Sequence, residues 1–161
     1  MPKDAASHPI LVPVDFSPHS EAALLYACRL ADCLDQPLLI LHVAHDPAEM
    51  PGYYARAVKK RKKILLRIED MAGEVLQTFV ERMQEEHPRQ KALRRAGSLL
   101  VVGLPVTRIL EVVQLHQAEM VVMGSQGRTG LRRVMLGSKA EQVVRLCPVP
   151  VTIVKVPGET G

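Results

Sequence analysis

Short, unbroken runs of aliphatic residues alternate along the chain with longer stretches in which apolar residues recur every three or four positions. Five such runs are rich in Val, Ile and Leu: Ile10–Val14, Pro37–Val43, Leu99–Val102, Met120–Met123 and Val149–Val156. Unbroken apolar runs of this length are typical of strands that are covered on both faces, as in parallel sheets. The pattern therefore predicts five buried parallel strands.

The stretches between these runs have the period of amphipathic helices. One of them, between the second and third runs, carries an apolar stripe over about five helical turns. The apolar positions are Ala23, Ala27, Leu30 and Leu34; Ile64, Ile68, Met71, Val75, Phe79 and Met83; Ile109, Val112, Val113 and Leu115; and Ala140, Val143, Val144 and Cys147. Alternating strands and helices predict an α/β fold with right-handed crossovers. We expect one doubly wound domain over residues 1–161, a five-stranded parallel sheet sandwiched by four helices.

Residues that cap helices and interrupt strands agree with this order. Ser17-Pro18 is typical of a helix N-cap followed by the first helical residue. Ser138, with Glu141 three positions later, predicts a capping box at the start of the last helix. Pro150 lacks a backbone N–H, so the last run is expected at an edge of the sheet. Because an open edge invites pairing with a second chain, we expect a homodimer through Val149–Val156.

Length and composition narrow the class of protein. The 161 residues are 47% hydrophobic and 24% charged, which suits one globular domain and excludes intrinsic disorder. No apolar run approaches the roughly 20 residues of a membrane span, and Met1–Pro9 lacks the apolar core of a signal peptide. Cys28, Cys33 and Cys147 form no CxxC pair and imply no disulfide framework. We therefore expect a cytoplasmic protein, since free thiols are typical of a reducing compartment.

Charge is unevenly distributed along the chain. The formal net charge is +4, but the first third is acidic and the basic residues gather in 56–95 and in the last quarter. The sharpest basic run, Lys59–Lys63, could contact nucleic acid or an anionic surface, border the phosphate end of a pocket, or form the solvated first turns of a long helix. Aromatic residues are only 3% of the chain, so nucleic acid is not the expected partner. The irregular stretch Ala44–Val58 before this run predicts a functional loop.

A glycine-rich segment follows the fourth run directly. Gly124, Gly127 and Gly130 let the backbone approach a ligand closely, and successive N–H groups in such a loop form an anion-binding concavity. Gly137-Ser138 then opens the last predicted helix with free N–H groups, a hydroxyl and the positive end of the helix dipole. Ligands of doubly wound sheets bind beyond the carboxyl ends of the strands, so these residues predict a phosphate site. The alternative is a glycine-rich connection with an ordinary N-cap at Ser138.

Three polar side chains lie at the ends of the first two runs. Asp15 can accept a hydrogen bond from an exocyclic amine or a ribose hydroxyl, or it can cap the first helix. His42 and His45 have HxxH spacing, but zinc needs three or four ligands and no third is evident, so a structural or surface role is expected. The chain has no GxSxG motif and no Ser-His-Asp order, which gives covalent catalysis little support.

The spacing Gly124-x2-Gly127-x9-Gly137-Ser138 resembles the nucleotide-binding motif of the universal stress protein family. The resemblance extends over most of the chain, through Ile10–Ser17, Leu41–Val43, Gly103-Leu104-Pro105 and Cys147–Val149. It implies a Rossmann-like fold of the adenine nucleotide alpha-hydrolase kind, with strand order 3-2-1-4-5. It also implies binding of ATP or AMP, with Mg²⁺ as a companion of ATP, and it agrees with dimerisation.

The resemblance further assigns the parts of a nucleotide site. The implied nucleotide-binding residues are Pro13, Val14, Asp15, Val43, Met123, Gly124, Gln126, Gly127, Arg128, Gly137, Ser138 and Lys139. Those from the first two runs would surround the adenine, which Asp15 and Val43 would contact. Those around Gly124 would flank the ribose and phosphates, and those from Gly137 onward would hold the phosphates. Gln126 departs from the family pattern, in which His is frequent; an amide can donate a hydrogen bond but cannot carry a proton.

Three functions are compatible with these features. The first is a regulatory module of the stress response that binds ATP or AMP, hydrolyses ATP at most very slowly, and signals to an unknown protein partner. The second is a transferase or hydrolase on the same nucleotide scaffold, which would need acidic metal ligands that are not evident here. The third is an interaction domain without nucleotide, in which the glycine loop packs against itself.

Overall fold

The computed structural model describes residues 8–45, 58–127 and 136–156, and for residues 58–66 it describes the backbone alone. Five parallel strands form one sheet in the order β3-β2-β1-β4-β5. The strands are β1 (Ile10–Pro13), β2 (Leu38–Ala44), β3 (Gly97–Val102), β4 (Met120–Gly124) and β5 (Val151–Val154). This topology confirms the predicted parallel sheet and its strand order. The predicted loop Ala44–Val58 falls almost entirely outside the described residues.

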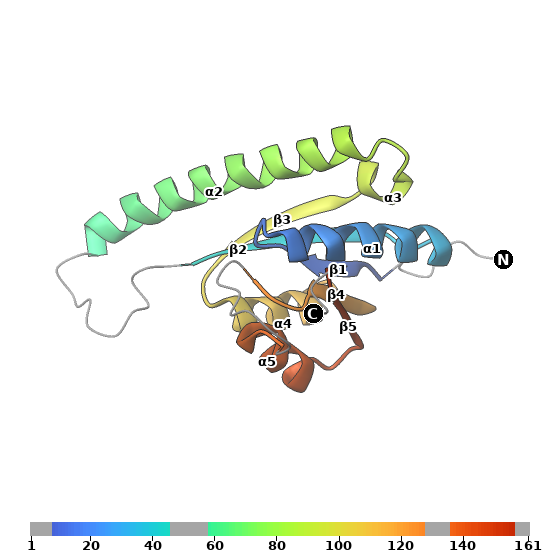
Figure 1. Cartoon of the computed structure of the whole chain (residues 1–161). Coiled ribbons are helices and arrows are strands. Elements are labelled where there is room, and N and C mark those ends of the chain that lie inside the picture. Colours follow the sequence, from blue (N-terminus) through green and yellow to red (C-terminus); the bar gives the residue numbers. More distant parts are fainter. Residues whose placement is uncertain (1–7, 46–57, 128–135, 157–161) are drawn as a thin grey trace, which may run out of the picture.

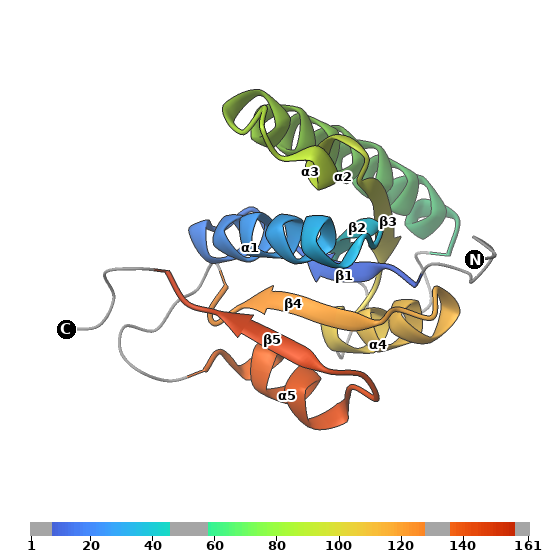
Figure 2. The ribbon, with the colours of Figure 1, turned by 90° about the vertical axis from the view of Figure 1, so that its right-hand side faces the viewer.

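Helices cover both faces of the sheet (Figure 1, Figure 2). Three of them, α1, α2 and α3, pack on one face, and α4 and α5 pack on the other. The helices are α1 (Pro18–Leu34), α2 (Val58–Glu86), α3 (Lys91–Arg94), α4 (Pro105–Leu115) and α5 (Ser138–Leu146). The sequence predicts four helices, but the described residues form five. The helix that the prediction misses is α3, which has only four residues and is too short for apolar periodicity to reveal it.

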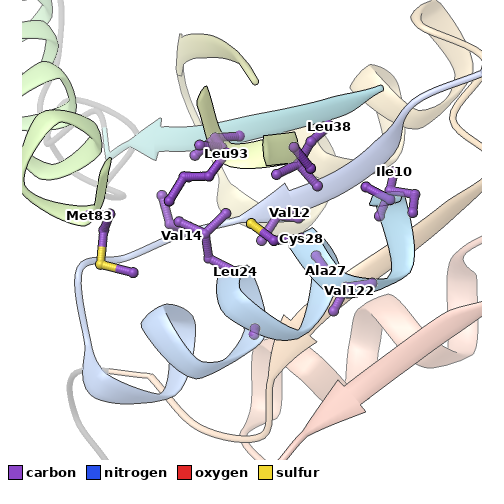
Figure 3. Close-up of a cluster of buried hydrophobic side chains, with 14 of the residues drawn as sticks. Ile10, Val12, Val14, Leu24, Ala27, Cys28, Leu38, Met83, Leu93 and Val122 are labelled. Carbon is purple, nitrogen blue, oxygen red and sulfur yellow. The ribbon is translucent and has the colours of Figure 1, made fainter. Parts of the chain in front are cut away.

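The central strand β1 is buried on both faces. Ile10, Leu11 and Val12 are each 0% exposed. Ile10, Val12 and Val14 point toward α1 (Figure 3), whereas Leu11 joins the core under α4 and α5. Burial on both faces is the reason that this strand is an unbroken apolar run. Each large side chain fully buried here stabilises the fold by about 1.5–3 kcal/mol.

The buried face of α1 differs from the predicted one. Ala23 and Ala27 are fully buried as expected, but Leu34 is 54% exposed and the neighbouring Leu24 and Cys28 are buried instead. Small alanine side chains allow the helix to approach the sheet closely, so a wider band of its surface is covered. Leu34 lies in the last turn, just before the left-handed C-cap residue Asp35 (φ 52°), where the chain turns toward β2.

The apolar stripe of α2 divides into two parts. Phe79 and Met83 are buried against the sheet, but Met71 and Val75 are 67% and 49% exposed. The main cause is the face of the helix: Leu76, next to Val75, is buried, so Met71 and Val75 lie on a side of α2 that is turned away from the sheet. The first part of α2 also extends beyond the ends of the strands that its second part covers (Figure 1). α2 has 29 residues, yet none of the helices in the described ranges combines the length and apolarity needed to cross a bilayer.

Two further apolar positions predicted for the core also lie at the surface. Leu115 of α4 is 78% exposed and Val144 of α5 is 45% exposed, while Ile109 and Val143 on the same helices are buried. Both helices cover only one face of the sheet. A stripe broader than the contact therefore leaves its margin in solvent.

The two predicted helix starts have different outcomes. The Ser17 hydroxyl accepts the N–H of Ser20 (3.3 Å), which confirms the cap of α1. The capping box at Ser138 is wrong: Ser138 is the first residue of α5, and its N-cap is Gly137, which makes no side-chain hydrogen bond. The carbonyl of Gly137 accepts the N–H of Glu141 (2.9 Å), so the first helical bond begins one residue earlier than predicted.

β5 lies at an edge of the sheet, as Pro150 predicts, although the strand is shorter than the apolar run. Pro150 directly precedes the strand, and its carbonyl accepts the N–H of Val121 (2.9 Å). At the other end the carbonyl of Val154 accepts the N–H of Ser125 (3.0 Å). Since parallel strands alternate the direction of their backbone groups, Val151 and Ile153 direct theirs away from the sheet.

The three free cysteines differ in environment, and this predicts a labelling order. Burial, together with a smaller effect of the nearby Asp32 carboxylate, raises the pKa of the Cys28 thiol to about 12, whereas Cys33 is exposed. Only thiolates react rapidly. We expect a maleimide to modify Cys33 in the native protein and Cys28 only after unfolding, with Cys28 still unreactive as the pH rises from 7 to 9.

Peptide mass spectrometry after timed labelling gives the measurement. Cys33→Ser serves as the control, because it should remove the fast phase and leave the rest unchanged. Equal rates for Cys28 and Cys33 in the native protein would contradict the burial of Cys28.

Candidate functional site

The sheet has a switch point between β1 and β4, which are neighbours in the middle of the sheet. The helix that follows β1 packs on one face, and the helix that follows β4 packs on the other. In doubly wound folds, the crevice between two such strand ends is where ligands bind. The residues that follow β1 and β4 therefore define the candidate site.

A tight hydrogen-bonded turn connects β1 to α1. Asp15 Oδ1 accepts the backbone N–H of Ser17 (3.1 Å) and the Ser17 hydroxyl (2.5 Å), and the Asp15 N–H donates to Ser20 Oγ (3.4 Å). Phe16 between them has φ 66°, a left-handed conformation that non-glycine residues rarely adopt. Asp15 Oδ1 therefore has the alternative role predicted for this residue, which is to organise the start of α1.

The ring of His42, near the end of β2, holds this turn against the sheet. Its Nδ1 donates to the carbonyl of Val14 (2.8 Å), which assigns the proton to Nδ1. The Phe16 ring lies 4.3 Å from the His42 ring and 5.2 Å from that of Phe79, measured between centroids. His42 thus has the structural role expected for it, and His45 is exposed.

Two glycines bring the end of β4 against the start of α1. A Cβ on Gly124 would lie 2.8 Å from the backbone carbon and oxygen of His19, and a Cβ on Gly127 would lie 2.8 Å from Asp15 Oδ2. Only hydrogen fits between these groups without a shift. The structure therefore places Asp15 and the glycine segment side by side, as the predicted site requires.

The start of α5 is attached to the same place. The N–H of Gly137 donates to the carbonyl of Ser125 (2.8 Å), so this N–H is occupied by the protein itself. The first N–H groups inside a helix have no acceptor within it, and α5 has no side-chain cap. Ser138 and Lys139 are exposed in this first turn. The helix end therefore has the properties of an anion-binding site.

The other predicted site residues are deeply buried, half-buried or outside the described residues. Val14 and Met123 are 4% and 8% exposed and belong to the cores on opposite faces, so each could line a ligand site only at its margin. Pro13, Val43 and Gln126 are half-buried. Arg128 and Gly130 lie outside the described residues.

Sequence reasoning missed His19 and Phe16. His19 is 7% exposed, and its Nδ1 lies 3.5 Å from Ser125 Oγ, across the junction of α1 and β4. Phe16 joins β1, β2 and α2 through its ring contacts. Neither residue has a sequence signal beyond its place in the segment that follows Asp15, since the contacts are made by segments far apart in the chain.

Two surface hollows lie away from this site. One, of about 650 Å³, runs between α1 and β5 and includes Tyr26 and Lys155. The other, of about 640 Å³, is lined by Asp32 and by four basic residues, Arg89, Lys91, Arg94 and Arg95. Neither borders Asp15 or the glycine segment.

These features define a doubly wound α/β domain with a candidate anion site at its switch point. A sequence model of the universal stress protein family matches residues 7–155, and the chain belongs to this family. A universal stress protein of Methanocaldococcus jannaschii is 28% identical over 160 residues, covering 91% of this chain and 93% of that protein.

Solved structures share the fold. The universal stress protein UspA from Lactobacillus plantarum superposes with a TM-score of 0.72 at 23% identity, over 92% of this chain and 97% of that one. A universal stress protein in complex with cAMP gives a TM-score of 0.63 at 23% identity, over 93% and 98%. One from Archaeoglobus fulgidus in complex with dAMP gives 0.55 at 21% identity, over 92% and 98%.

The contact at Gly124 predicts a large difference between two Gly→Ala variants. Gly124→Ala should lower the free energy of unfolding by about 1–3 kcal/mol, because its Cβ would overlap the backbone of His19. Gly73→Ala, in α2, should raise it by about 0.5–1 kcal/mol, since its Cβ meets only Leu100 at 3.9 Å and alanine favours helix. Urea denaturation followed by circular dichroism measures both. A Gly124→Ala protein as stable as the wild type would contradict the close approach of α1 to β4.

Proposed function

We propose that this chain, residues 1–161 acting as one domain, binds ATP or AMP at the switch point and serves as a nucleotide-responsive module of the stress response. One observation carries the proposal: Asp15, Gly127 and the uncapped start of α5 lie together at the ends of β1 and β4. A carboxylate beside an anion-binding backbone suits a nucleoside phosphate, which has an amine and hydroxyls at one end and anionic oxygens at the other.

The two ends of the nucleotide have separate partners in this proposal. Asp15 would accept a hydrogen bond from the adenine amine or a ribose hydroxyl, with Pro13 and Val43 at the margin. The backbone of Gly124–Gly127 and the first turn of α5, with Ser138 and Lys139, would receive the phosphates. The cAMP and dAMP complexes of other universal stress proteins support an adenine nucleotide as the ligand class.

The chemical groups at the proposed site favour at most slow hydrolysis of ATP. Gln126 cannot carry a proton, and Asp15 Oδ1 is already engaged by Ser17. Asp15 is also the one carboxylate among the described residues of the proposed site, so Mg²⁺ accompanying ATP would be held mainly by phosphate and water. We propose binding and signalling, rather than catalysis, as the function. An unidentified regulatory protein would receive the signal, and a cytoplasmic location stays a prediction.

The first test addresses the phosphate end of the site. We expect Lys139→Gln to weaken ATP binding by about three- to tenfold and AMP binding less, since a charge at a helix N-terminus acts on the nearest phosphates. Adenosine binding should not change. Isothermal titration calorimetry with all three ligands gives the measurement, and Lys91→Gln, exposed on α3, is the control.

A second variant tests the position of the site. Gly127→Asp would place a carboxylate against Asp15 and the phosphates, and it should abolish ATP binding while circular dichroism shows the fold retained. Undiminished ATP binding by this variant would show that the nucleotide lies elsewhere.

We also propose that two copies pair through the β5 edge. The outward backbone groups of Val151 and Ile153 can continue the sheet into a second copy. In this arrangement the site and the dimer edge are neighbours, because Ser125 bonds both β5 and the start of α5.

Two substitutions of Ile153 distinguish the contribution of its backbone N–H to pairing from the contribution of its side chain. Ile153→Pro removes an outward N–H and should give a monomer, whereas Ile153→Ala keeps the N–H and should remain dimeric despite the lost methyl groups. Light scattering after size exclusion measures the mass of each folded variant. A monomeric wild type at micromolar concentration would refute the pairing.

A further inference from the structure

The charges of α2 oppose the helix's own dipole. The first ten residues, Val58–Arg67, hold six basic residues and no acidic one, whereas the other nineteen, Ile68–Glu86, hold six acidic residues and one basic one. The first turn contains no acidic residue and the last turn no basic one. Helices are stabilised by the reverse arrangement, with acidic groups first and basic groups last. This charge order therefore destabilises α2 in isolation.

The same helix leaves an apolar strip uncovered. Met71 and Val75 are 67% and 49% exposed, and Ile68, three residues before Met71, is half-buried. Their spacing of three and then four residues is the heptad spacing of a helix pair, and Ile64 continues it in the sequence. The core-facing residues Leu76 and Met83 lie on the adjacent face of α2, and the buried Phe79 lies at the border between that face and the strip.

One arrangement would compensate the unfavourable charge order of α2 and also cover its apolar strip. An antiparallel second α2 would place its acidic half beside the basic half of the first, and it would oppose the two helix dipoles. It would also cover the strip, because antiparallel heptads place Ile68 of one helix beside Met71 of the other. In that register the positions that flank the strip on its solvent side are Arg67 and Glu74, both exposed.

We propose that α2 is a self-association surface, on which a second copy of this chain places its own α2 antiparallel. Arg67 of each copy then lies beside Glu74 of the partner subunit, so the two ion pairs are equivalent by symmetry. The Lys59–Lys63 run, which the nucleotide site does not use, lies along the acidic half of the partner's helix. The one basic residue of that half, Arg82, is already engaged by Glu21 and Glu86 of its own chain.

The arrangement leaves room for two domains. Each α2 packs on its own sheet through Leu76–Met83 and extends beyond the strands with its first part (Figure 1). In the proposed register the centres of the two buried segments are about twenty residues of helix, or about 30 Å, apart along the helix axis. That offset is about the diameter of a small domain, so the two sheets lie toward opposite ends of the helix pair.

Charge reversal provides the decisive test because the pairs are reciprocal. Sedimentation equilibrium over a concentration series should show an assembly of twice the mass of the smallest species, with a dissociation constant on the order of 10–100 μM for so short a strip. Arg67→Glu and Glu74→Arg should each weaken this step by about tenfold, and the double variant should restore it. Neither residue belongs to β5, so edge pairing cannot produce this pattern.

A second pair of variants tests the apolar strip. Met71→Gln should weaken the association at least as much, whereas Leu115→Gln, at a more exposed position on α4, should leave it unchanged. Circular dichroism confirms the fold of each variant. The proposal is overturned if the wild type shows no such step up to about 200 μM, or if the double charge reversal fails to restore the association.

Discussion

The contact between the start of α1 and the end of β4 is the constraint on which the site depends. Gly124 has no Cβ, so the backbone of His19 can lie directly on the strand end, where a methyl group would come within 2.8 Å of it. The fully buried Ala23 and Ala27 continue this close approach along the helix. Because α1 is held so near, Asp15 before it and Gly127 after β4 become neighbours although they are far apart in the chain.

Hydrogen bonds extend this junction to the edge of the sheet. Ser125 donates its N–H to Val154 of β5 and accepts the N–H of Gly137 at the start of α5. A ligand that moved the glycine segment would therefore act on β5 through a single residue. This gives a physical route between the proposed nucleotide site and the proposed dimer edge.

The helix α2 has an exposed apolar strip and a charge order that opposes its own dipole. Single exposed apolar residues such as Leu115 also occur on other helices, but α2 exposes Met71 and Val75 at heptad spacing and carries its charges against its own dipole. The proposed antiparallel pairing of α2 with a second copy would make both features favourable, because it would cover the strip and oppose the two dipoles.

The sequence by itself determined the class of fold, the strand order through the family resemblance, and the segments that meet at the site. Unbroken runs such as Ile10–Val14 have one physical explanation, burial on both faces, and Pro150 at the last run requires an edge. The cap at Ser17 was equally readable, because capping depends on residues three positions apart.

Only the tertiary structure decided which apolar positions are buried and which polar groups are already satisfied. Periodicity marks a face of a helix but cannot show where the sheet beneath it ends, so Met71, Leu115 and Leu34 were expected in the core and lie at the surface. Likewise, local pattern made Ser138 a cap, yet Gly137 takes that place, and its N–H is held by Ser125 of another segment. Such contacts join residues distant in sequence, and their geometry exists only once the sheet has placed them together.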